Sequence, residues 1–255
     1  MDAHREHARP VAVATGPAAV RRAAVRATLA WSTRDTEPWW LVVGPDSCEL
    51  HADPDRWLPA QDPVGRSLTM SIGCALLNAR ASLDADGAAY RVERLPDPTR
   101  QHHLATITLL DTAVPGTAGR GGLAELAAGG FDRSTIDPFV DWPLQSDEVE
   151  RLACAVRAEG AVLHRLEPDV VVVATAQNRA LDWLTAGEAV QRLVLEAASL
   201  GFAVGEVVGG LELPSDRTLL RERIGGLDHP QAVLRLGALG GRIRGRRRPL
   251  AEVLH

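Results

Sequence analysis

The sequence predicts an α+β chain made of two tandem halves, residues 1–120 and 121–255. Helical and strand-like segments follow one another in a similar order in both halves. A segment rich in glycine and proline, 111–130, separates them. Hydrophobic residues make up 45% of the chain and charged residues 24%, which is ordinary for a globular protein. Such a chain can pack its helices against mixed sheets.

The first half begins with small apolar residues and arginines at helical spacing, which predicts an amphipathic helix over 16–30. Segment 39–52 predicts two strands joined by the turn GPDS. Residues 66–87 predict a long helix that a glycine closes. Two further strands are expected, at 90–95 and 104–110.

The second half repeats this order. A short helix precedes a run of four valines, which is typical of a buried strand, and a long amphipathic helix then ends in glycine. We expect these elements, followed by two more strands, at 147–160, 170–175, 181–201, 204–208 and 232–236.

Composition and charge exclude several function classes. The formal net charge of −5 gives no electrostatic reason to expect nucleic acid, and the basic run at 242–248 is local. Three separated cysteines without a CxxC pair favour a reducing compartment. The polar first residues are unlike a signal peptide, and no apolar run approaches the ~20 residues of a membrane helix. We therefore expect a cytoplasmic protein that binds neither nucleic acid nor membrane.

Four stretches carry a resemblance to a known family. They are 30–40 (AWSTRDTEPWW), 53–78, 131–139 (FDRSTIDPF), and the combination of 182–202 with 229–254. In order and spacing they resemble the Acg-like, actinobacterial branch of the nitroreductase-like flavoproteins. The resemblance covers most of the chain. It implies the nitroreductase-like fold, with the two halves forming a pseudo-dimer within one chain, so that an oligomer is not needed to complete a cleft.

The resemblance also implies a function. It suggests an FMN-binding oxidoreductase that passes hydride from NAD(P)H through the flavin to a small-molecule acceptor, or a degenerate flavin-binding descendant of such an enzyme. The loop containing Ser32, Asp35 and Glu37 would line the flavin ring. Basic and hydroxyl side chains would hold the phosphate, namely Arg133, Ser134, Arg246 and Arg248. No catalytic residue is assigned.

The sequence departs from the family at positions that bear on the cofactor. Asp35 and Glu37 stand where the family loop has amides, and ionised carboxylates cannot donate hydrogen bonds to flavin oxygens. Asp132 and Ile136 replace two cations of the phosphate motif. The segment that forms a lid in the family is missing. The alternative is therefore a non-catalytic protein that sequesters a ligand or binds a partner after losing the flavin site.

Two other features have simpler interpretations. The pair His102–His103 precedes a strand, and because no third ligand of suitable spacing is visible we expect a surface turn and no metal site. Cys74 lies within the long first-half helix beside apolar residues, so we expect it to be buried and inert.

Overall fold

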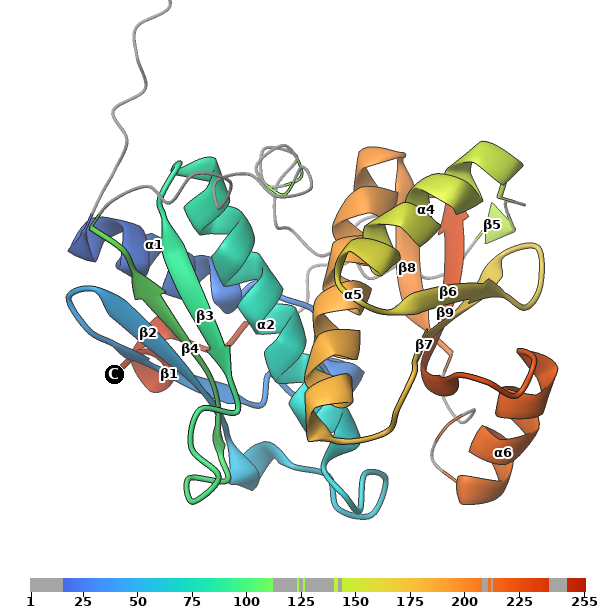
Figure 1. Cartoon of the computed structure of the whole chain (residues 1–255), viewed down its shortest axis with the longest axis horizontal. Helices are drawn as coiled ribbons and strands as arrows, with labels where there is room; N and C mark the ends of the chain where they lie inside the picture. The colour runs from blue at the N-terminus through green and yellow to red at the C-terminus, as the bar shows by residue number, and fades with distance from the viewer. Residues whose placement is uncertain are drawn as a thin grey trace, which may run out of the picture.

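A computed structural model describes most of the chain, and its gaps include three of the predicted phosphate contacts, Arg133, Ser134 and Arg246. The described residues are 16–111, 123, 126, 140–141, 144–207, 211, 213–238 and 247–255. Within them, two β-sheets lie side by side, and the two longest helices pack against each other between the sheets (Figure 1). Every helix and strand expected from the sequence is present, with ends shifted by a few residues.

The first sheet is antiparallel throughout, with strand order β1-β2-β4-β3. Two helices and two short 3-10 turns accompany it, and the helices pack on one another and on the sheet. The elements are α1 (Pro17–Ala27), η1 (Thr33–Asp35), β1 (Trp39–Val43), β2 (Ser47–Ala52), η2 (Pro54–Arg56), α2 (Arg66–Ala85), β3 (Tyr90–Arg94) and β4 (His103–Leu109).

The second sheet is organised around its last strand, which pairs antiparallel with three others. The fully buried valine strand β7 lies between β9 and β6. The elements are β5 (Val140–Asp141), α4 (Ser146–Ala158), β6 (Val162–Arg165), β7 (Val170–Thr175), α5 (Ala180–Ser199), β8 (Phe202–Glu206), α6 (Pro214–Arg223) and β9 (His229–Ala238).

The chain then returns to the first half. The short helix α7 (Leu250–Val253) packs on β1, and Leu254 forms a parallel bridge with Leu41 (Figure 1). The amide of Val43 donates to the carbonyl of His255 at 2.8 Å. The final segment, predicted to belong to the second half, thus packs on the first sheet. The boundary near residue 120 lies outside the described residues, and the pseudo-dimer stays a prediction.

Helices α2 and α5 approach closely because each has a glycine at their crossing. A Cβ atom at Gly73 would overlap the carbonyl oxygen of Leu184, and one at Gly187 would overlap that of Met70. Cys74 lies at the same crossing, fully buried as expected, and its Sγ donates to the carbonyl of Gly187 at 3.1 Å.

Buried ion pairs join the same two halves. The carboxylate of Glu188, 1% exposed, accepts hydrogen bonds from Arg94 at 2.6 and 2.8 Å and pairs with Arg80. Glu159 lies 2.6 Å from both Arg80 and Arg192. Buried charges need such partners because an unpaired one is costly. No helix within the described residues is long and apolar enough to cross a membrane.

Candidate functional site

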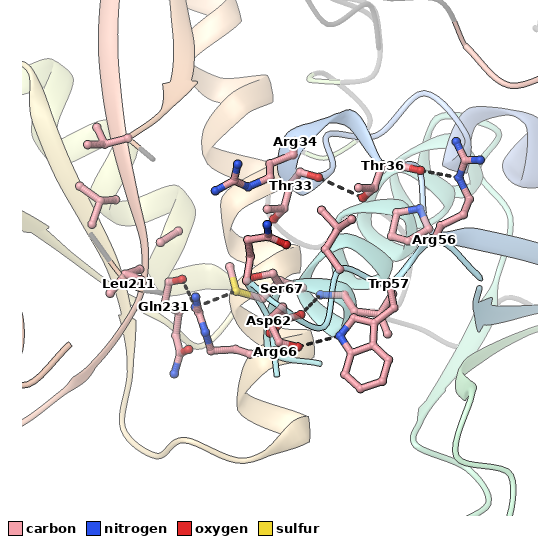
Figure 2. A pocket seen from close by; sticks show the side chains of 18 residues that line it. Thr33, Arg34, Thr36, Arg56, Trp57, Asp62, Arg66, Ser67, Leu211 and Gln231 are labelled. Atoms are coloured by element: carbon pink, nitrogen blue, oxygen red, sulfur yellow. Dashed lines mark hydrogen bonds between the residues drawn. The ribbon is translucent and has the colours of Figure 1, made fainter. Parts of the chain in front are cut away.

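A cavity of about 60 Å³ lies where the first half faces the second, which is room for only a few water molecules (Figure 2). The loop before β1 lines one side, and the segment 56–62 with the start of α2 lines another. The second half closes the cavity through residues near β8 and along β9, namely Val207, Leu211, Gln231, Ala232 and Val233. All of the described residues that line the cavity thus come from one chain.

The loop contributes Thr33, Arg34, Thr36 and Pro38 to the cavity. Its backbone is unusual, because the φ angles are 52° at Arg34, 55° at Asp35 and 44° at Glu37. Residues with side chains rarely adopt such angles, and they persist only where surrounding contacts impose them. One such contact is the hydrogen bond from Nε of Arg56 to the carbonyl of Thr36, at 2.6 Å (Figure 2).

The C-terminal arginines impose the rest of the loop's conformation. Arg247 pairs with the carboxylate of Glu37 at 3.0 Å, and the amide of Arg248 donates to the same carboxylate at 2.9 Å. Arg247 also donates to carbonyls that follow α1, those of Leu29 and Ala30. These carbonyls lie just beyond the end of α1, where the chain is not helical, and the guanidinium supplies hydrogen-bond donors to them.

The side chain of Arg248 also makes hydrogen bonds and an ion pair within the first half. It donates to the carbonyls of Glu37 and Trp39, both at 2.9 Å, and lies 3.4 Å from the carboxylate of Asp53. It is not among the residues that line the cavity. The expectation that Arg248 faces the cleft and holds a phosphate therefore receives no support from this placement.

The other predicted site residues divide into two groups. Ser32 is buried behind the loop, where its Oγ accepts a hydrogen bond from the amide of Glu37 at 3.1 Å. The loop expected to line a ring does line the cavity, but through neighbours of Ser32, Asp35 and Glu37 and not through those residues. The remaining three lie outside the described residues: Arg133, Ser134 and Arg246.

The floor of the cavity is polar and well ordered. Asp62 accepts a hydrogen bond from the amide of Leu68 at 2.9 Å, which fixes the start of α2 (Figure 2). The buried Arg66 donates to the backbone carbonyl of Gln231 across the junction. The side-chain amide of Gln231 donates to Thr175 at 2.9 Å, whereas its buried Oε1 has no hydrogen-bond partner among the described residues. A buried acceptor of this kind gains from a donor on a ligand.

The lining suits a ligand with a flat apolar body and polar edges. Met70, Leu211 and Val233 supply apolar surface, while Arg34 from the loop and the buried Arg66 from the floor bring guanidinium groups to the cavity from two sides (Figure 2). Guanidinium groups recognise planar carbonyl and anionic groups. The family resemblance included Arg66 only within the stretch 53–78, and it gave no role to Arg34 or Gln231.

A second cluster corrects an expectation. His102 lies in an exposed turn, as expected for the pair, but His103 begins β4, is 5% exposed, and stacks on His51 with ring centroids 4.6 Å apart. His51 and Glu49 come from β2, the neighbouring strand, and their ligand-type atoms lie within 4.8 Å of each other and of His103. The interpretation that no third ligand is available was therefore wrong, because strand pairing brought together residues far apart in sequence.

Sequence comparison relates the chain to mycobacterial proteins. Two curated relatives from Mycobacterium tuberculosis, "Putative NAD(P)H nitroreductase Rv3131" and "Putative NAD(P)H nitroreductase MT3217", are each 32% identical to it over 197 residues, covering 77% of the chain. This chain is a relative of the nitroreductases. The predicted resemblance is thereby confirmed, and it extends to "Putative NAD(P)H nitroreductase acg", 33% identical over 88 residues, or 34% of the chain and 27% of that relative.

The sequence match covers only part of each relative's length. The aligned region is 56% of the two nitroreductases first named, so the chain spans about half the length of the curated relatives it matches. No family model matches the chain. Among solved structures, a Desulfovibrio desulfuricans protein named "putative nitroreductase", in complex with FMN, aligns over 56% of this chain and 96% of its own, at 15% identity and a TM-score of 0.41. A Parabacteroides distasonis protein named "Putative NADH dehydrogenase/NAD(P)H nitroreductase" is 13% identical, with a TM-score of 0.43. The match covers 51% of this chain and 97% of that protein.

Proposed function

We propose that this chain is a flavin-binding oxidoreductase of the nitroreductase kind, that NAD(P)H is its electron donor, and that the cavity at the junction receives the flavin ring. The observation that supports this most is the position of the 33–38 loop. This loop resembles the family's ring-lining loop, and it faces β9 of the second half across the cavity. Bound FMN would supply the hydride-accepting and hydride-donating chemistry.

The chemistry of the lining fits this ring better than its present volume does. The apolar wall around Met70 and Leu211 suits the ring face, and the guanidinium groups of Arg34 and Arg66 suit its carbonyl edge. A cavity of about 60 Å³ must widen before a flavin enters. The loop with its strained φ angles is the element whose movement would open it, since strain of this kind is common in ligand clamps.

The phosphate would be held by residues beyond the described cavity. We retain Arg133, Ser134 and Arg246 as proposed contacts, because a dianion needs charge-assisted donors. Ser32, Asp35, Glu37 and Arg248 would then contribute by shaping the loop. Since both sides of the cavity come from one chain, we propose that no second subunit is needed to complete the site.

Titration of FMN into the purified protein tests this proposal, with quenching of flavin fluorescence as the readout. We expect saturable binding that Arg34→Ala weakens at least about tenfold, the loss of one charge-assisted hydrogen bond. Arg179→Ala is the matched control, because its side chain is 70% exposed and is not among the described residues that line the cavity. Protein that stays colourless after reconstitution contradicts the proposal and favours a role in ligand sequestration or partner binding without flavin.

A further inference from the structure

Three side chains with metal-ligand chemistry meet on one face of the first sheet. Glu49 and His51 are two residues apart on β2, and His103 on β4 is the Cα partner of His51. Nε2 of His51 lies 2.8 Å from Oε2 of Glu49, and Nε2 of His103 lies 3.9 Å from the same oxygen. Both imidazoles are nearly fully buried, at 3% and 5% exposure, while Glu49 reaches the surface at 30%.

The surroundings hold the cluster in place. Trp40 on β1 is the Cα partner of His51, and its ring stacks on the imidazole with centroids 4.0 Å apart. The three rings of Trp40, His51 and His103 thus form a continuous stack that covers one side of the cluster. Nδ1 of His103 is buried without a hydrogen-bond partner among the described residues. A buried polar atom left in this state calls for an explanation beyond packing.

We propose that Glu49, His51 and His103 form a binding site for a divalent transition-metal ion, for which zinc is the ion favoured by two imidazoles and one carboxylate. Tetrahedral zinc with bonds of about 2.0–2.2 Å places its ligand atoms about 3.3–3.6 Å apart. The measured separations of 2.8 and 3.9 Å lie on either side of this range. Three protein ligands leave a fourth position for water or another small ligand.

Three adjustments accompany binding. Nε2 of His103 gives up its 2.8 Å hydrogen bond with Oγ1 of Thr106. The planes of His51 and His103 are only 18° apart, so their ring lone pairs lie in two nearly parallel planes, and one ring must turn to direct both at a single ion. The guanidinium of Arg100 also donates to Oε2 of Glu49, at 2.9 Å. Arg100 is half exposed and can swing into solvent, and as a cation it competes with the metal for the carboxylate.

The competition by Arg100 gives a test that does not disturb the buried residues. Zinc is titrated by calorimetry into the full chain, freed of any affinity tag and stripped with a chelator. We expect one ion per chain, a loss of at least about tenfold in affinity for His51→Gln and for His103→Gln, and a gain of about threefold or more for Arg100→Gln. Cobalt substituted for zinc should give a visible absorption band that His103→Gln abolishes.

Matched controls use histidines elsewhere in the chain. His102→Gln removes the exposed neighbour of His103, and the double variant His4→Gln with His7→Gln removes the two histidines nearest the start of the sequence. Neither should change the zinc affinity. The proposal is overturned if the full chain binds no zinc at micromolar concentrations, if the His4/His7 variant abolishes binding, or if binding survives both buried substitutions. Should those two variants fail to fold, an unchanged or weaker affinity in Arg100→Gln overturns it. None of these readouts depends on flavin.

Discussion

Gly73 of α2 contacts Gly187 of α5 at the point where the two long helices cross, and neither residue has a Cβ atom. Each glycine faces the backbone of the opposite helix, so the backbones of the two helices are in direct contact there. The cavity lies beside this crossing, since Arg66 and Met70, on the first turns of α2, line it. The geometry of the site therefore depends on two residues that never touch a ligand.

Replacing Gly187 by alanine should destabilise the chain by about 3 kcal/mol or more, because the added methyl group would overlap the carbonyl oxygen of Met70 and neither backbone can yield easily. Urea denaturation followed by circular dichroism measures the loss. Ser199→Ala at the exposed end of the same helix serves as control and should change stability by less than about 0.5 kcal/mol. Equal stability of the two variants would disprove this account of the crossing.

Replacing Glu188 by glutamine should cost about 3–5 kcal/mol, because it leaves Arg94 without its carboxylate partner and leaves Arg80 with Glu159 as its one remaining buried partner among the described residues. Glu196→Gln on the same helix is the matched control. That carboxylate pairs with Arg151, which is 56% exposed, so about 0–1 kcal/mol is expected. Comparable losses from both variants, in thermal or chemical denaturation, would mean that burial of the pair is unimportant.

Acid should weaken the same network. Burial acts to raise the pKa of Glu159, but Arg80 and Arg192 outweigh it and hold the pKa below its ordinary value of 4.5. The stability contributed by the ionised carboxylate is therefore fully present above about pH 4.5 and is lost as the pH falls through the lower pKa of the folded state. Unfolding free energies measured across this range should fall more steeply for the natural sequence than for Glu159→Gln. Parallel curves for the two proteins would contradict the assignment.

Glu37→Gln should destabilise the chain by about 1–3 kcal/mol, since the buried carboxylate loses its charge-assisted bonds to Arg247 and to the amide of Arg248. Glu252→Gln, on a carboxylate that is 59% exposed, is the control and should have little effect. The midpoint of thermal unfolding reports both changes. A Glu37→Gln protein as stable as its parent would show that the arginines do not hold the loop.

The elements that sequence periodicity predicts well are those with long regular patterns. Helix α5 repeats apolar residues at helical spacing over twenty residues, and β7 is an unbroken apolar run. β6 was missed because it is only four residues long and its second half is polar, with His164 and Arg165, and α6 because it is short and polar. Both elements owe their formation to neighbours: β6 pairs with β7, and α6 packs beside β9.

The candidate site was predictable only in outline. A family resemblance pointed to the 30–40 loop, yet which of its side chains face inward depends on positive φ angles that the sequence does not reveal. Arg247 binds Glu37 across 210 residues of chain, and His51 meets His103 through strand register. Contacts of this range arise from tertiary packing, and a single sequence carries no periodic signal for them.

The reduction of bound flavin by NAD(P)H tests the central claim most directly. The protein is reconstituted with FMN, freed of excess cofactor, and mixed with NADH or NADPH without oxygen while the flavin absorption band is followed. The account predicts a fast bleaching of the band in the natural sequence and a loss of bound flavin in Arg34→Ala but not in Arg179→Ala. Flavin that binds but is reduced no faster than free FMN by either nucleotide would contradict the proposed activity.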